Sequence, residues 1–311
     1  MNTVLVTGGA GFIGSHLIDR LISNGYFVRC LDNFSSGKKE YVSHHKNKDF
    51  KLIEGDVLDE KTLRSSMDDC KTVFHLSANP DVRLGEKDTK VHFQQNIQAT
   101  YTVLETMRQC EIKNIVFTST STVYGDAKEL PTPEDYGPLV PISLYGASKL
   151  ACEALISSYC HTFGMKSVIY RFANVVGSRS THGVTYDFVQ KLKKNPQELE
   201  ILGDGRQMKS YLYITDCIEA MMFGLSKSTK NVEIFNIGSE DWIDVREIAD
   251  VVSQVMGVHP SYHFTGGIDG GRGWKGDVKA MRLSIDLLKK MGWRPRYASR
   301  EAIKLTAQEI L

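Results

Sequence analysis

Tyr145 and Lys149 are residues whose types and spacing suit acid–base chemistry. They open a segment with helical periodicity, and a separation of four residues places both side chains on one face of a helix. A tyrosine with its ordinary pKa of about 10 is a poor base at neutral pH, but a nearby ammonium group favours the phenolate and lowers that pKa. The pair could therefore remove a proton from a hydroxyl group. By itself the pattern is weak, because Tyr-x-x-x-Lys also occurs by chance on helix surfaces.

A run of hydroxyl-bearing residues precedes this pair. Residues 118–125 read Thr-Ser-Thr-Ser-Thr-Val-Tyr-Gly and lie at the end of a predicted strand, with Thr120 placed 25 residues before Tyr145. A hydroxyl group at that edge can hydrogen-bond a substrate oxygen and orient it. This third element favours a catalytic site over a chance pairing.

Three glycines near the start of the chain indicate a phosphate-binding turn. Gly8, Gly11 and Gly14 follow an apolar strand and lead into a helix. In such a turn the first glycine permits a tight bend, the second lets the backbone approach a pyrophosphate, and the third lets the helix pack closely on the strand. The N–H groups at the helix start then meet the phosphate charge. The spacing is Gly-x-x-Gly-x-x-Gly rather than the Gly-x-Gly-x-x-Gly of the dinucleotide-binding motif. A turn that binds no ligand is therefore the alternative.

Asp32 supports the dinucleotide interpretation. It ends the second predicted strand, 18 residues after Gly14, where a carboxylate accepts hydrogen bonds from an adenosine ribose and repels a 2′-phosphate. NAD is therefore favoured over NADP, although Lys38 and Lys39 leave room for NADP. Asp56 follows the third strand and could accept a hydrogen bond from the adenine amino group, or act only as a turn residue.

These residues must be held in place by alternating strands and helices. The alternation predicts βαβ units and an α/β fold with a doubly wound parallel sheet of the Rossmann type, which binds ligands above the carboxyl ends of its strands. The predicted strands are 4–6, 26–31, 51–54, 72–76, 114–119 and 167–172, and the predicted helices are 12–23, 61–67, 91–110, 144–163 and 186–194.

The alternation changes after about residue 174, where polar, glycine-bearing loops begin. We expect an NAD-binding domain over residues 1–173, to which the chain returns at about 210–238. A smaller C-terminal substrate-binding α/β domain is expected over 174–209 and 239–311. The glycine-rich stretch 265–276 is typical of a mobile or ligand-wrapping loop.

The composition is that of an ordinary globular protein, with 41% hydrophobic and 24% charged residues. The 38 basic residues nearly cancel the 37 acidic ones, and the net charge of +1 provides no global field for holding nucleic acid. No apolar run is long enough to predict a transmembrane helix, and no targeting signature opens the chain. We therefore expect a cytoplasmic protein with neither nucleic acid nor membrane as a partner.

The cysteines and histidines are not spaced for a disulfide framework or a metal. The six cysteines are scattered without a Cys-x-x-Cys pair, so reduced core thiols are expected. No histidine pair has the spacing of a metal site, and no metal is expected. His75, His161, His182 and Glu153 are assigned structural roles, His75 beside the cofactor.

Taken in order, these motifs resemble the extended short-chain dehydrogenase/reductases. Within them the chain is most similar to the UDP-glucose 4-epimerases and related nucleotide-sugar epimerases, over residues 2–296. The resemblance implies tightly bound NAD, a UDP-hexose substrate and three catalytic residues: Thr120, Tyr145 as the base and Lys149 as its partner.

The resemblance also implies two sets of contacts. Those to NAD are Gly8, Gly11, Phe12, Ile13, Gly14, Asp32, Asn33, Ser35, Ser36, Gly37, Asp56, Val57, Leu76, Ser77, Ala78, Asn96, Thr118, Tyr145, Lys149 and Phe172. Those to the substrate are Thr120, Tyr145, Asn174, Gly183, Val184, Lys209, Tyr211, Arg272, Lys275 and Asp277.

The residues before Val-Tyr-Gly indicate the reaction. In the dehydratases and decarboxylating relatives one or two acidic residues stand there, whereas this chain has Ser121 and Thr122. Epimerisation at C4 through a transient 4-keto sugar is therefore favoured. The alternatives are another sugar (N-acetylglucosamine or glucuronate), a nucleotide-sugar dehydratase or reductase, and a non-catalytic NAD sensor.

The chain departs from the family pattern at two substrate positions. Lys209 stands where many members have an arginine that grips the diphosphate, and Trp274 takes the place of a second arginine, whose charge Arg272 or Lys275 could supply. Met281 aligns near the position of a tyrosine that limits the size of the sugar pocket in some relatives. A methionine there could admit an N-acetylated sugar, or it could only fill space. Apolar residues on helices 91–110 and 144–163 predict a homodimer, because related enzymes pair these helices.

Overall fold

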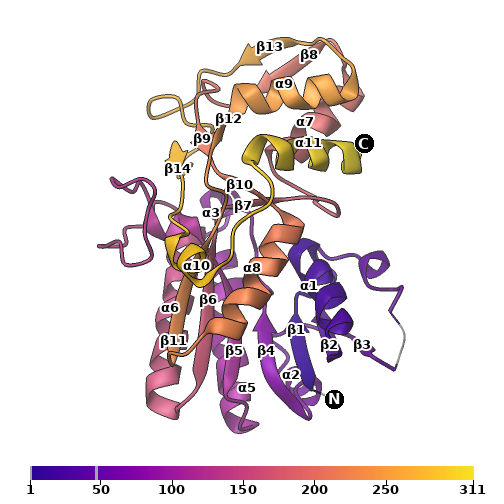
Figure 1. The fold of residues 1–311 in the computed structure, drawn as a ribbon, viewed down its shortest axis with the longest axis vertical. Coiled ribbons are helices and arrows are strands. Elements are labelled where there is room, and N and C mark those ends of the chain that lie inside the picture. The colour runs from indigo at the N-terminus through magenta and orange to yellow at the C-terminus, as the bar shows by residue number, and fades with distance from the viewer. Residues whose placement is uncertain (1, 46–47) are drawn as a thin grey trace. The chain divides into compact units, whose positions relative to one another are not determined.

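The computed structural model describes residues 2–45 and 48–311 (Figure 1). Its central element is a seven-stranded sheet in which β1 is followed outwards by β2 and β3 on one side and by β4, β5, β6 and β11 on the other. The strands are β1 (Thr3–Thr7), β2 (Phe27–Asp32), β3 (Phe50–Glu54), β4 (Cys70–His75), β5 (Asn114–Thr120), β6 (Lys166–Phe172) and β11 (Val232–Ile237). The pairs β1–β2, β1–β4, β2–β3 and β4–β5 are parallel. The predicted doubly wound parallel sheet is confirmed.

Helices cover both faces of this sheet, as βαβ connections require. The longer helices of this part of the chain are α1 (Phe12–Ser23), α2 (Glu60–Ser66), α5 (Ala99–Gln109), α6 (Leu144–Phe163) and α8 (Ile214–Lys227). Short helical segments are α3 (Leu84–Lys87), α4 (Lys90–His92), η1 (Lys39–Tyr41) and η3 (Ser121–Tyr124). The core between the layers includes Leu5, Leu31, Leu104, Phe117 and Ile156, all 1% exposed or less. Strands buried on both faces need near-continuous apolar residues, which is why this region carries short β-branched runs.

Local patterns predicted several boundaries well. Helices α1 and α6 have the predicted bounds, because their apolar residues recur at helical spacing. The predicted helix 91–110 is helical, but residues near its start form the π-helical segment η2 (Phe93–Gln98). The predicted helix 186–194 begins earlier, at Val184, as α7.

The later segments form smaller sheets and helices. They are β7 (Asn174–Val176), α7 (Val184–Lys194), β8 (Glu198–Ile201), β9 (Met208–Lys209), β10 (Tyr211–Tyr213), β12 (Ile243–Asp244), α9 (Val245–Met256), β13 (Ser261–Phe264), β14 (Ala280–Met281), α10 (Asp286–Met291) and α11 (Ser299–Ile310). β7 pairs with β10 and β8 with β13, while β9 lies between β12 and β14. Asp244 begins α9 as an N-cap, because its side chain accepts a hydrogen bond from the Glu247 N–H at 2.7 Å.

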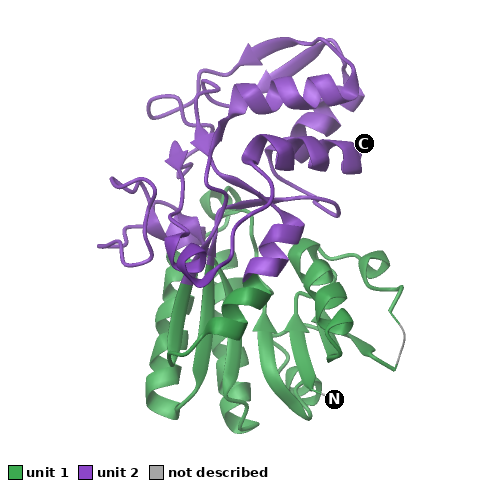
Figure 2. Cartoon of the chain, in the orientation of Figure 1, with its two compact units in different colours: residues 1–119, 147–170, 221–234 green, residues 120–146, 171–220, 235–311 purple. Residues whose placement is uncertain are grey.

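Contacts divide the chain into two compact units (Figure 2). Unit 1 contains residues 1–119, 147–170 and 221–234, and unit 2 contains 120–146, 171–220 and 235–311. Residues 120–146 thus belong to unit 2, whereas the sequence analysis assigns them to the NAD-binding domain. Because contacts do not test which residues bind which ligand, the predicted domain roles stay predictions.

Candidate functional site

The glycine turn joins β1 to α1 in unit 1. Gly8 has φ +68°, in the left-handed region that favours glycine. A Cβ at Gly14 would lie 2.8 Å from Gly9 Cα and closer still to Gly8 O, so α1 approaches the turn as only glycine permits. At Gly11 the nearest described atom to an added Cβ is Gly8 O, at 3.2 Å. The turn therefore leaves room at the N-terminus of α1, which fits a pyrophosphate.

Asp32 ties the turn to the loop that follows β2. Its carboxylate accepts hydrogen bonds from the backbone N–H groups of Ala10 at 2.9 Å and Phe34 at 2.8 Å. Burial raises the pKa of Asp32, while these two hydrogen bonds act in the opposite direction. Gly37 lies against the same carboxylate, where an added Cβ would stand 2.9 Å from Oδ1. The predicted adenosine-side residues are thus brought together around one buried acid.

Asn33, Ser35 and Asp56 form a second group on this side. The Asn33 side-chain amide donates to Asp56 Oδ2 at 2.8 Å, and the Ser35 N–H donates to Asn33 Oδ1 at 3.0 Å. Asp56 Oδ1 accepts from the Leu58 N–H at 2.9 Å, as in an ordinary Asx turn. The turn alternative raised for Asp56 is therefore present, together with its contact to the ribose-side loop.

Hydrogen bonds join the loop after β4 to β1 and to the helix around η2. The N–H groups of Leu76 and Ser77 donate to the Thr7 carbonyl at 3.1 Å and to Thr7 Oγ1 at 3.3 Å. Asn96 accepts from the Asn79 N–H at 2.8 Å and donates to Ser148 Oγ at 2.9 Å. Asn96 thus has a buried structural role, and the π-helical η2 contains it.

The other predicted NAD contacts occupy the ends of neighbouring elements. Phe12 and Ile13 begin α1, Ser36 lies in the loop after β2, Val57 follows β3, Ala78 follows β4 and Phe172 ends β6.

Lys149 is held at the carboxyl end of β5. Its ammonium group donates to the Thr118 carbonyl at 2.7 Å and lies 4.6 Å from the centre of the Phe117 ring. Burial lowers the pKa of Lys149 to about 8, and the charges of Cys152 and Glu153 oppose this shift. Tyr145 lies four residues before Lys149 on α6. The buried ammonium group of Lys149 therefore lies on the face of α6 that also carries Tyr145.

Glu153, for which only a structural role was expected, lies beside Ser119 and is buried. It is 5% exposed, and Ser119 Oγ donates to its carboxylate at 2.5 Å. Glu153 follows Lys149 by four residues on α6, so its negative charge helps to keep the lysine protonated. The spacing Tyr-x-x-x-Lys-x-x-x-Glu was the available signal.

Thr120, the predicted catalytic threonine, is the last residue of β5 and the first residue of its segment in unit 2. Thr120 Oγ1 accepts hydrogen bonds from the N–H and the hydroxyl of Thr122, both at 3.1 Å. Tyr124, at the end of η3, donates to Asn236 Oδ1 at 2.8 Å and accepts from Arg171 at 2.9 Å. Arg171 and Asn236 come from β6 and β11, so the sequence offered no local signal for them. Together they hold the Thr-Val-Tyr-Gly segment.

The predicted diphosphate contacts form an ion-pair cluster in unit 2. Lys209 on β9 lies 2.5 Å from Asp277 Oδ1 and 5.4 Å from the Trp274 ring centre. Arg272 donates to the Asp277 carbonyl and forms a two-pronged pair with Asp126 at 2.7 and 3.1 Å. The structure therefore brings Lys209, Arg272 and Asp277 together and places Trp274 beside the lysine.

The remaining predicted substrate contacts lie elsewhere in unit 2. Asn174 begins β7, and its side chain donates to the Ser210 carbonyl at 3.4 Å. Tyr211 on β10 is 5% exposed, and burial raises its pKa. Gly183 and Val184 are the N-cap and first residue of α7, and Lys275 lies in the glycine-rich loop.

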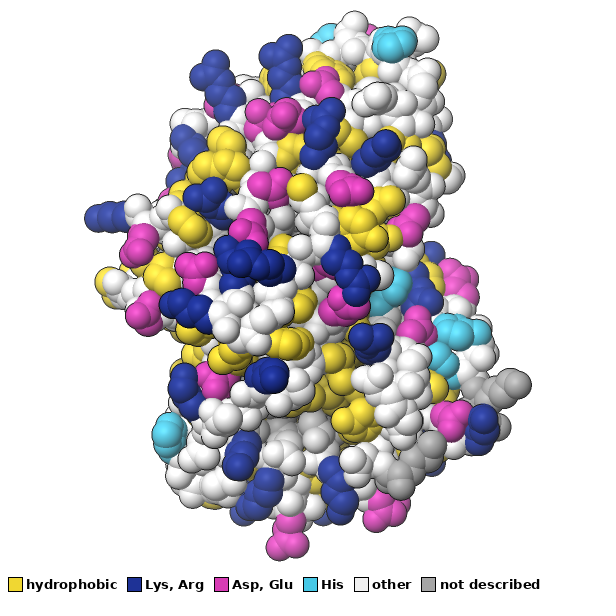
Figure 3. Space-filling model, in the orientation of Figure 1, with side chains coloured by type: hydrophobic (Ala, Val, Ile, Leu, Met, Phe, Trp, Pro, Cys, Tyr) yellow, Lys and Arg dark blue, Asp and Glu magenta, His cyan; other side chains and the backbone are white. Residues whose placement is uncertain are grey.

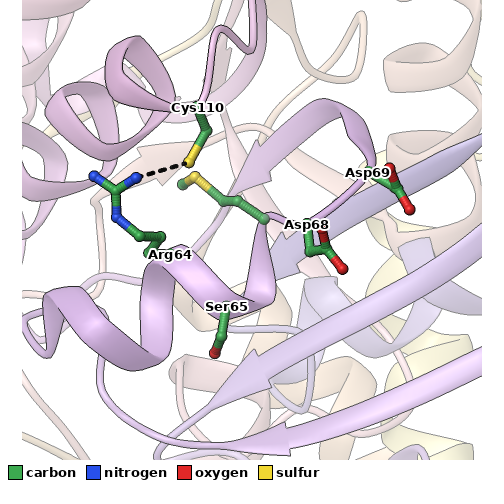
Figure 4. Close-up of a pocket in the computed structure, with 6 residues that line it drawn as sticks. Arg64, Ser65, Asp68, Asp69 and Cys110 are labelled. Carbon is green, nitrogen blue, oxygen red and sulfur yellow. Dashed lines mark hydrogen bonds between the residues drawn. The ribbon is translucent and has the colours of Figure 1, made fainter.

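A cavity of about 460 Å³ in unit 1 lies apart from these residues (Figure 4). Arg64, Asp68 and Cys110 are among its lining residues, and the Arg64 guanidinium approaches Cys110 Sγ at 3.9 Å. Asp68 precedes β4 and Cys110 precedes β5, so the cavity opens at the amino ends of these strands. Ligands of such sheets bind at the opposite, carboxyl ends.

The surface charge is mixed. Figure 3 shows lysine and arginine side chains interspersed with aspartate and glutamate on the visible face, as a net charge of +1 would suggest. Within residues 2–45 and 48–311, no helix has the length and hydropathy that crossing a membrane requires.

Comparisons with known proteins agree with this geometry. The model of the NAD-dependent epimerase/dehydratase family matches residues 4–238. The UDP-glucose 4-epimerase of Corynebacterium glutamicum is 31% identical over 272 residues, which cover 83% of this chain and 81% of that protein.

Two solved structures are similar over 99% of this chain and 98% of their own. One is a UDP-galactose 4-epimerase, with a TM-score of 0.88 and 42% identity. The other is the UDP-glucuronic acid 4-epimerase from Bacillus cereus in complex with UDP-glucuronic acid and NAD, with a TM-score of 0.89 and 29% identity. The chain therefore belongs to the NAD-dependent epimerase/dehydratase family, and NAD is its cofactor.

Proposed function

We propose that this enzyme interconverts the C4 epimers of a UDP-hexose, UDP-glucose and UDP-galactose, through a transient 4-keto sugar. The 42% identity to a UDP-galactose 4-epimerase supports the substrate. The observation that carries the reaction type is the neutral pair Ser121 and Thr122 before Val-Tyr-Gly. The Thr122 hydroxyl is hydrogen-bonded to Thr120, and no carboxylate stands there to drive the loss of water.

Tyr145 is the proposed base. As a phenolate it takes the proton of the sugar 4′-hydroxyl, and it returns a proton to the 4-keto oxygen after the ring has presented its other face. Lys149 on the same helix face favours the phenolate through its positive charge, and the Thr118 carbonyl keeps that ammonium group in position. NAD, when bound, supplies a reversible acceptor for the hydride of C4′, the sugar carbon that is oxidised.

Thr120 is proposed to orient the sugar oxygen. The two hydrogen bonds from Thr122 occupy the lone pairs of Thr120 Oγ1. Its own O–H hydrogen is then what Thr120 can donate to a substrate oxygen. A hydroxyl held in this way stabilises charge that develops on the oxygen as the proton leaves.

The ion-pair cluster of unit 2 is proposed to hold the diphosphate. Arg272 offers a planar guanidinium group, and Lys209 offers a point charge that Asp277 already partly neutralises. A firm grip on the nucleotide with a weak grip on the hexose lets the 4-keto sugar turn before it is reduced.

A homodimer is also proposed. Phe93, Tyr101 and Phe163 are 58%, 49% and 39% exposed, and they lie on the segments 91–110 and 144–163 from which pairing is expected. Burying exposed aromatic side chains against a second copy of the chain would stabilise a dimer. Sedimentation at micromolar concentration tests this, and a species of monomer mass alone would contradict it. The cytoplasmic location stays a prediction.

The substrate is tested by incubating the protein separately with UDP-glucose, UDP-N-acetylglucosamine and UDP-glucuronate and identifying the C4 epimers by NMR. UDP-N-acetylgalactosamine formation is the second candidate, because Met281 is unbranched, flexible and buried. Net formation of NADH, or a stable dehydrated product, would contradict the proposal.

The role of Tyr145 is tested by Tyr145→Phe, which we expect to lower kcat by roughly 10²- to 10⁴-fold. Tyr262→Phe is the matched control, because the Tyr262 hydroxyl contacts Asp250 on α9. Undiminished epimerisation by Tyr145→Phe would overturn the mechanism.

A further inference from the structure

Asp19, His44 and His45 gather outside the predicted site, in unit 1. Asp19 lies on α1, and the two histidines lie in the loop between η1 and β3. Nε2 of His44 is 3.0 Å from Asp19 Oδ1, and Nε2 of His45 is 2.8 Å from the same oxygen. One potential ligand atom from each residue lies within 4.8 Å of the other two.

We propose that these three side chains bind a divalent transition-metal ion. Two imidazole nitrogens and one carboxylate oxygen are typical zinc ligands, with bonds of about 2.0–2.2 Å. Around a tetrahedral ion at that distance, neighbouring ligand atoms lie roughly 3.3 Å apart. The observed separations of 3.0 and 2.8 Å need to open by only a few tenths of an ångström. A water molecule would complete the coordination.

The ligands differ in how firmly they are held. Asp19 is carried by α1, whose residues Leu17 and Ile18 are fully buried. The His45 side chain is 10% exposed and packs on Phe50 of β3 with ring centres 5.1 Å apart. The His44 side chain is 50% exposed. Two ligands are thus largely preorganised, and the third can adjust to the ion.

Described lysines of the same loop lie beside carboxylates, as Lys48 does beside Asp49 at 3.7 Å. Lys38 lies 3.4 Å from Glu40, and Lys39 lies 2.7 Å from Glu54. Asp19 supplies the carboxylate that a divalent ion would meet at this site.

Spacing between histidines in the sequence does not predict this site. The carboxylate comes from α1, 25 residues before His44, and only the fold brings it to the pair. A bound ion would fasten the loop that begins after Asp32 to the helix that begins at the glycine turn. The site contains none of the predicted NAD or substrate contacts, so it is independent of the proposed reaction.

The experiment uses the full chain without an affinity tag, stripped with a chelator. Zn²⁺, Ni²⁺ and Mg²⁺ are titrated separately by calorimetry, Mg²⁺ as an ion that prefers oxygen ligands. We expect one Zn²⁺ or Ni²⁺ per chain with micromolar or tighter affinity, and no comparable binding of Mg²⁺. At 100 times the Kd, the melting temperature should rise by about 4 °C.

Three single variants remove the ligands: Asp19→Asn, His44→Gln and His45→Gln. Each should weaken binding at least tenfold, while His161→Gln, which removes an exposed histidine of α6, should not. Circular dichroism and NAD binding confirm that each variant is folded. Absence of stoichiometric binding in the parent protein would overturn the site. Unchanged affinity in Asp19→Asn, or equal weakening by His161→Gln, would do the same.

Discussion

Gly11 and Gly14 allow the phosphate-binding role of the turn to be separated from its packing role. At Gly11 an added methyl group meets Gly8 O at 3.2 Å, and the φ of −76° suits any residue. At Gly14 a methyl group would lie 2.8 Å from Gly9 Cα and closer still to Gly8 O. Gly11→Ala should therefore affect the ligand, and Gly14→Ala should affect the protein.

The sizes of the two effects differ. Overpacking by Gly14→Ala costs about 1–3 kcal/mol, because backbone atoms must move apart. This corresponds to a fall in melting temperature of roughly 2–5 °C for a chain of this length. For Gly11→Ala, the loss of a good N-cap residue costs about 0.5–1 kcal/mol, and reduced freedom of the unfolded chain returns about 0.4–1 kcal/mol. Its stability should therefore change little.

NAD affinity should fall in Gly11→Ala. A methyl group at the start of α1 keeps the pyrophosphate away from the N–H groups, and one charge-assisted hydrogen bond is worth about 1.5–3 kcal/mol. The Kd for NAD should rise roughly 10- to 150-fold. Calorimetric titration of NAD into the apoprotein and thermal unfolding without NAD measure the two effects. Unchanged NAD affinity in Gly11→Ala would refute the assignment of the turn, and unchanged melting of Gly14→Ala would refute the packing.

Three further predictions concern charge and capping. Glu153→Gln removes a negative charge that raises the pKa of Lys149, so Lys149 should lose its proton at a lower pH. In a profile of kcat against pH, the fall in activity on the alkaline side should therefore begin at a lower pH than in the parent enzyme. An alkaline side that does not move would contradict this prediction. Burial lowers the pKa of His75 in the folded protein to about 3. In the unfolded chain the pKa of this histidine is about 6.5, so below that pH the unfolded state binds a proton that the folded state does not. The free energy of unfolding therefore falls as the pH drops from 6.5 towards 3. Between pH 7 and 5 this contribution is roughly 2 kcal/mol in urea unfolding, and His75→Asn should abolish it. Asp244→Ala removes the N-cap bond to Glu247 and should cost about 0.5–2 kcal/mol without changing NAD affinity.

Much of the fold followed from local patterns. The bounds of α1 and α6 were predictable because helical periodicity is a property of neighbouring residues. The π-helical segment at Asn96 was not predicted, and the Asn96 side chain contacts Asn79 and Ser148, which come from other parts of the chain. Contacts between residues far apart in the sequence leave no periodic signal along the chain from which such a segment could be predicted.

The sequence by itself determined the order and chemical types of the motifs: a glycine turn, an acid after the second strand, hydroxyls at the end of β5, and a tyrosine and lysine one helical turn apart. These rest on local rules of turns, strands and helices. Only the tertiary structure decided that Asp32 caps the glycine turn, that Glu153 lies beside Ser119, and that Asp19 meets two histidines. Such contacts join residues far apart in the chain, and their distances follow from how the strands and helices pack rather than from spacing in the sequence.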